Sequence, residues 1–138
     1  MGTAFISNKL IKAALVARIK SKATITSLLA TTSEVRENQY QGTEFLYPSV
    51  RTRIISNEPI GNPGCGQNVS LSIMSFSEQA SSAQCEEIAG IIATEFHGKQ
   101  FVSNSLAFAV TVDNLIPAIR IDKRTWRSEV LMTAIITG

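Results

Sequence analysis

The sequence predicts one α+β domain over residues 1–138, built on an antiparallel or mixed sheet of about four to five strands. An N-terminal helix and a second helix are expected on one face of the sheet. Apolar residues alternate over Val69–Phe76, as in a half-buried strand, and then recur at helical spacing between residues 80 and 98. A length of 138 residues with 44% hydrophobic content also suits one core rather than two domains.

The first helix is predicted to follow Ser7, which can act as its N-cap. Its inward face is apolar and consists of Leu10, Ile11, Ala14, Leu15 and Ile19. The other face is basic and carries Lys9, Lys12, Arg18, Lys20 and Lys22. This separation of apolar and charged residues is typical of an amphipathic helix on a core.

Residues 24–30 are predicted to add a short turn or helix that brings Leu28 and Leu29 to the core. An irregular connection should follow over residues 31–45, with a short strand around Val35. Tyr47-Pro48 begins the next strand, because proline is tolerated at a strand's first position.

That strand is predicted over Ser49–Ser56, with Arg51 and Arg53 on the face opposite to Val50. A stretch rich in glycine and proline over Asn57–Asn68 is expected to end the pairing. Loops of this length are usually functional or disordered, so this one is either a contact element or a long solvated turn.

The second helix is expected to be capped by Ser77 or Ser81 and to end before Gly98. Its apolar face is formed by Ile88, Ile91, Ile92 and Phe96. This helix should therefore cover the sheet.

The C-terminal part of the chain is predicted to form strands. Leu106–Thr111 and Ile116–Ile121 flank Asp113-Asn114, and together with Pro117 they predict either one bent strand or two. A turn at residues 123–125 leads to the last strand, Trp126–Thr137, whose faces both become apolar near its end, as in a central strand.

Composition excludes several classes of function. The net charge of +2 results from 13 basic and 11 acidic residues, so no whole-molecule field favours nucleic acid or an acidic membrane. No apolar stretch reaches the roughly 18 to 20 residues of a membrane span, and the N-terminus lacks the pattern of a signal peptide. We expect a cytosolic protein with Cys65 and Cys85 as free thiols.

The residues that could carry chemistry do not form a recognisable enzyme site. His97 is the only histidine, which excludes a multi-histidine metal site, and its place at a helix end favours a bond to the helix terminus. Cys65 could act as a nucleophile only beside a base, and nothing in the sequence places His97 there. Glu86 and Glu87 point about 100 degrees apart on a helix and fit a solvated face. We therefore expect no enzyme activity, no metal and no cofactor.

The order of elements resembles that of the tail terminator (tail completion) proteins of long-tailed bacteriophages. The local phrases that carry the likeness are LIKAALVARIKSKATITSLLA, FLYPSVRTRI, VSLSIMSFSEQASSAQCEEIAGIIA and WRSEVLMTAIIT. The likeness spans nearly the whole chain. It implies a structural virion protein that forms a ring, usually a homohexamer, caps the tail tube, stops its polymerisation and joins the tail to head-completion or connector proteins.

The resemblance also implies where the protein would act. It would be located in the tail or neck of the virion and assemble in the host cytoplasm, with DNA passing through the ring lumen in at most non-specific contact. The first alternative is another neck or tail ring, or a tube-associated phage protein. The second is a small nucleic-acid-binding α/β assembly factor, which would need basic residues interleaved with exposed aromatics.

A ring subunit needs surfaces that meet a neighbour or the tube. The candidate interface residues are Arg51, Arg53, Glu58, Asn62, Arg120, Lys123, Arg124, Trp126, Arg127 and Glu129. The basic members either pair with acidic groups of a neighbour or form a solvated sheet face, because surface pairs are usually weak. Trp126 either anchors an interface or lies at the edge of the core, and the same alternatives hold for Phe45 and Tyr47.

Overall fold

The computed structural model describes residues 5–29, 35–37, 48–60, 66–78, 82–121, 123 and 125–138. Several predictions fall outside the described residues, namely those for Asn62, Arg124, Cys65, Phe45, Tyr47 and Ser81. The element order is α1 (Asn8–Lys20), α2 (Ala23–Thr26), β1 (Val35–Glu37), β2 (Ser49–Pro59), β3 (Gln67–Ser77), α3 (Ala83–Phe96), β4 (Gln100–Ser103), β5 (Leu106–Arg120) and β6 (Trp126–Thr137).

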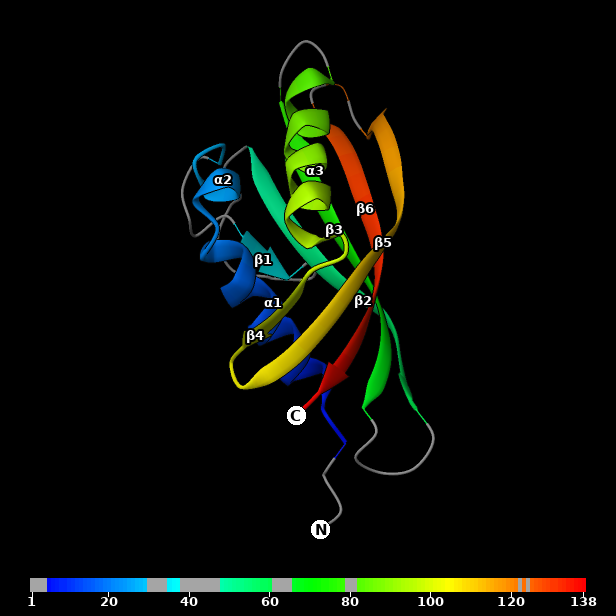
Figure 1. The fold of residues 1–138 in the computed structure, drawn as a ribbon. Helices are drawn as coiled ribbons and strands as arrows, with labels where there is room; N and C mark the ends of the chain where they lie inside the picture. Colours follow the sequence, from blue (N-terminus) through cyan, green and yellow to red (C-terminus); the bar gives the residue numbers. More distant parts are fainter. Residues whose placement is uncertain are drawn as a thin grey trace.

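The described strands form one six-stranded sheet in the order β1-β2-β3-β6-β5-β4 (Figure 1). β1 pairs with β2 in parallel, and every other neighbouring pair is antiparallel. The predicted α+β class with an antiparallel or mixed sheet is confirmed. β1 is the short strand expected around Val35, β6 lies in the middle of the sheet as expected, and β4 is a strand that the sequence pattern does not predict.

The β2–β3 hairpin is longer than predicted. Pairing continues to Pro59, which lies opposite Gln67, with one irregularity between Ile54 and Ser56. The expected loop over Asn57–Asn68 is therefore wrong at both ends. Pro59 is compatible with the ladder because it is the last residue of β2, where a missing N–H removes little pairing.

The segment from residue 106 to residue 120 is one strand, β5, rather than two. Its pairing with β6 shifts between Val112 and Asn114, and again between Ile116 and Ile119. The two irregularities contain the Asp-Asn pair and Pro117, as the sequence indicates for a bent strand.

Helix α1 holds the two ends of the strand order together. It packs against β1 and β2 on one side and against β4 on the other. The Ser103 hydroxyl of β4 donates to the Ala14 carbonyl of α1 at 2.7 Å. A single helix can reach both ends only if the sheet curls, so the core lies inside this curl.

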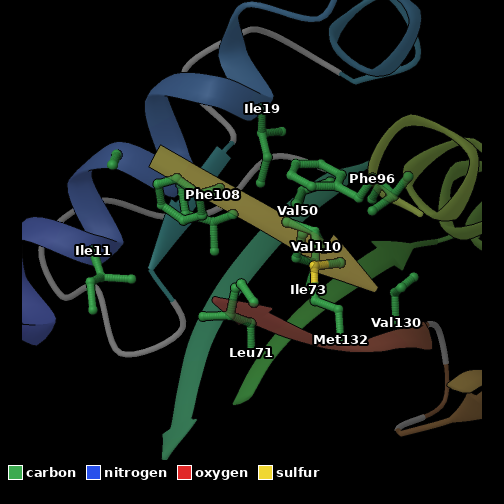
Figure 2. Packing of buried hydrophobic residues seen from close by; sticks show 14 of the residues in the cluster. Ile11, Ile19, Val50, Leu71, Ile73, Phe96, Phe108, Val110, Val130 and Met132 are labelled. Carbon is green, nitrogen blue, oxygen red and sulfur yellow. The ribbon is translucent and has the colours of Figure 1, made fainter. Parts of the chain in front are cut away.

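The core lies between the inner face of the sheet and the two long helices (Figure 2). Ile19 of α1 and Phe96 of α3 point toward the sheet near Val50, and Ile11 belongs to the same buried cluster farther along α1. Phe101 stacks on Phe108 with ring centroids 5.0 Å apart. Large side chains fill the inside of the curl. The burial of each one stabilises the folded state by about 1.5 to 3 kcal/mol.

Two details of the helices differ from the predictions. Leu10 is 53% exposed, because it lies about 100 degrees around α1 from Ile11 and falls outside the buried stripe. The N-cap of α3 is Ser82, whose hydroxyl donates to the Glu86 carboxylate and makes no side-chain bond to the helix backbone. Gly98 follows α3 in a left-handed conformation with φ of +69°, as predicted.

Candidate assembly surfaces

The outer face of the sheet brings four of the candidate interface residues together. Register places Arg51 and Arg53 of β2 beside β3, and Glu129 and Arg127 of β6 on its other side. Arg53 pairs with Glu129 at 3.2 Å, and Glu129 also accepts a hydrogen bond from Ser72. Arg53 is thus paired within its own chain, and Arg127 is half-buried.

Arg51 is buried instead of exposed. Only 2% of this residue is accessible, and its guanidinium donates to the Val50 carbonyl at 2.9 Å. Met74, its partner in register on β3, is buried as well. Both residues are thus shielded from solvent, and the alternative of a solvated sheet face is wrong for Arg51.

The other described candidates lie at opposite ends of the molecule. Arg120, Lys123 and Trp126 gather at the connection between β5 and β6, where the Arg120 guanidinium donates to the Lys123 carbonyl at 2.7 Å. It also lies 6.0 Å from the centre of the half-buried Trp126 ring. Glu58 is exposed near the other end of the strands, on β2.

Exposed apolar side chains in two parts of the sheet were not among the predicted candidates. Val102 and Ile135, 68% and 41% exposed, flank a shallow depression of about 470 Å³ on the outer face of β4, β5 and β6. Leu115 and Ile119 are exposed on the part of β5 that extends past β4, but on opposite faces, because Leu115 pairs with the buried Val130 and Ile119 pairs with Arg127. The apolar character of both faces of residues 126–137 was the sequence signal for Ile135, and Val102 belongs to the unpredicted strand.

A polar cluster attaches the N-terminal segment to the β2–β3 hairpin. The Gln67 side chain accepts from the Ile6 amide at 2.6 Å and donates to the Ile6 carbonyl at 3.0 Å. Asn57 donates to the Asn8 side chain at 2.8 Å and to the Ile6 carbonyl at 3.2 Å. Part of the predicted contact loop thus has a structural role within the chain.

Helices α1 and α3 carry charges of opposite sign. The charged residues of α1 are all basic, namely Lys9, Lys12, Arg18 and Lys20, and those of α3 are all acidic, namely Glu86, Glu87 and Glu95. Within the described part of the chain, Lys22, which lies just after α1, contacts Glu95 of α3 at 3.7 Å. Lys9, Lys20, Glu86 and Glu87 are exposed.

The histidine and the described cysteine have structural surroundings. His97 Nδ1 accepts a hydrogen bond from the Val112 amide at 3.0 Å. The side chain therefore binds the backbone of β5, whereas the sequence suggested a bond to the end of α3. Cys85 is fully buried, and burial raises the pKa of its thiol. Among the described residues no cluster of three or more His, Cys, Asp or Glu could hold a metal ion.

No helix in the described part of the chain combines the length and the hydrophobicity that crossing a membrane requires.

Comparison with protein-family models and with curated proteins gives no match. Solved structures do match. A chain from a structure described as the virion of a native gene transfer agent particle aligns with a TM-score of 0.73 and 16% identity, over 98% of this chain and 100% of that chain. A second solved structure aligns with a TM-score of 0.67 and 15% identity, over 96% of this chain and 97% of the other. At this identity the likeness establishes the shared fold.

Proposed function

We propose that this protein is a structural, non-enzymatic component of a phage-like virion, and specifically a ring-forming tail terminator. The observation that carries the proposal is the fold shared over almost the full length of both chains with a chain of a gene transfer agent virion. The resemblance of the sequence to tail terminators supports the specific role. Its partners would be further copies of itself, the tail tube protein and a head-completion or connector protein.

The geometry is consistent with a protein that acts through contacts. Exposed apolar side chains occur on the outer face of the sheet and on the extended end of β5, as in Val102 and Leu115. Large exposed apolar residues that cluster on a surface are typical of interaction sites. The polar candidates Arg120, Lys123 and Trp126 lie at the β5–β6 connection, beside the extended end of β5.

The proposal is tested by adding the purified protein to polymerising tail tube protein from the same virus. A tail terminator should form rings in negative-stain images, bind one end of each tube and shorten the tubes as its concentration rises. The control is the same titration with an unrelated small α+β protein. A protein that stays monomeric, leaves tube length unchanged and does not bind tube ends would contradict the terminator role.

The same experiment separates the terminator from another neck or tail ring. Another ring would assemble without limiting the length of the tubes. A nucleic-acid-binding factor would instead bind oligonucleotides with an affinity that falls steeply with salt.

A further inference from the structure

The exposed charges of the two long helices are complementary to each other but are not close partners within one chain. In α1, Arg18 lies over the Phe101 ring at 4.2 Å, and Lys22 just beyond the helix contacts Glu95. Lys9 and Lys20 remain exposed on α1, as do Glu86 and Glu87 on α3. The molecule therefore presents a basic helix face and an acidic helix face at separate places.

Gly90 adds an independent observation on α3. Glycine is the weakest helix former after proline, and one in a helix interior is destabilising relative to alanine. The backbone of Gly90 is an ordinary helix, and a Cβ placed on it would meet nothing within 4 Å. Neither conformation nor packing within the described chain explains this glycine, which lies one turn from Glu86 on the outward side of α3.

The outward side of α1 also combines exposed charges with small side chains, like the outward side of α3. Lys9 and Lys20 are eleven residues apart, so they project from the same face about 16 Å from each other. The exposed Ala13 and the half-buried Val16 and Ala17 lie between them. The distance between two packed helices depends on the side chains at the contact, and Gly90 and the two alanines are small.

We propose that the basic face of α1 in one copy packs against the acidic face of α3 in the next copy, across Gly90. The proposal rests on the ring proposed above and specifies the contact between its subunits. The two faces differ, so the contact is head to tail, and every copy in a closed ring uses both. Each exposed ion pair is weak, but every subunit is held on two sides.

Charge reversal tests this contact directly. The variants are Lys9→Glu with Lys20→Glu, Glu86→Lys with Glu87→Lys, and the combination of all four substitutions. Mass in solution is measured by light scattering over a concentration series at about 0.05 and 0.5 M NaCl, where screening differs strongly. Each double variant should weaken assembly at least about tenfold at low salt, and the fourfold variant should restore it, because all pairs are then reversed together.

Matched controls keep the result specific. Lys99→Glu reverses an exposed charge that lies off the two helix faces, and this variant should assemble as the unmodified protein does. Gly90→Leu should abolish assembly while circular dichroism shows a folded chain, because the side chain fills the contact. Gly90→Ala should raise the midpoint of thermal unfolding of the monomer and weaken assembly less than leucine does.

The possible failures are distinguishable. Rings that form equally in all variants would overturn this contact and leave the ring function standing. An unmodified protein that neither self-associates nor binds tube ends would overturn both proposals. If the fourfold variant is folded but does not assemble, the contact is wrong. It is also wrong if Lys9 and Lys20 prove necessary only for binding a mixed-sequence DNA duplex.

Discussion

At the scale of single residues, Gln67 links the N-terminal segment to the sheet. Its side chain is almost fully buried and exchanges two hydrogen bonds with the Ile6 backbone. Gln67→Ala leaves the buried Ile6 amide without its partner and the Ile6 carbonyl with Asn57 alone, so the free energy of unfolding should fall by about 1 to 3 kcal/mol. Urea unfolding measures this change.

The neighbouring Asn68 is exposed and serves as the control, because Asn68→Ala should change the free energy of unfolding by less than about 0.5 kcal/mol. Hydrogen exchange should also accelerate in residues 6–10 of the Gln67 variant. Equal stability of the two variants would show that the cluster does not hold the N-terminus.

Sequence reasoning was reliable for residues whose environment follows from periodicity. Ile11 and Leu15 are buried as predicted, whereas Leu10 is exposed. Leu10 was wrongly included in the buried stripe because the stripe was drawn from apolar identity alone. Arg51 shows a second limit. Alternation placed it correctly on the outer face, but its burial depends on what covers that face, which the pattern of one strand does not contain.

At the scale of the elements, the β4–β5 hairpin contains a testable strain. Asn104 and Ser105 form its two-residue turn with φ of +49° and +66°. Asparagine tolerates this left-handed region, while serine is strained in it. Ser105→Gly should therefore raise the free energy of unfolding by about 1 kcal/mol, as measured by thermal or urea unfolding.

Asn104→Gly is the comparison for this turn and should give a smaller gain. Destabilisation by Ser105→Gly would contradict the strain argument. The same turn explains why the sequence did not predict β4, because Asn-Ser lacks the glycine that marks a tight hairpin and the strand itself is four residues long. The strands β3 and β6, with sustained alternation, were predicted closely.

At the scale of the whole molecule, α1 is the element that joins both ends of the curled sheet. Leu15 of α1 is fully buried in the core, so Leu15→Ala should lower the free energy of unfolding by about 2 to 5 kcal/mol. Hydrogen exchange should increase at both ends of the sheet, in β1 and β4 together. Leu10→Ala is the control on the same helix, because Leu10 is exposed.

Loss of protection in only one of the two strands would contradict the role of α1 as a bridge. The curl itself was not predictable from the sequence. Amphipathic patterns indicated that helices cover one face of the sheet, but closure depends on contacts between α1 and a strand about ninety residues later, and local patterns carry no information on such pairings.

The bridge by α1 has a consequence for synthesis. The bond between Ser103 and Ala14 spans 89 residues, so α1 leaves the ribosome long before β4 exists. At typical translation rates this interval lasts on the order of 5 to 20 s. During that time the apolar stripe of a nascent helix has no complete sheet to cover, and a general chaperone would be its natural temporary partner.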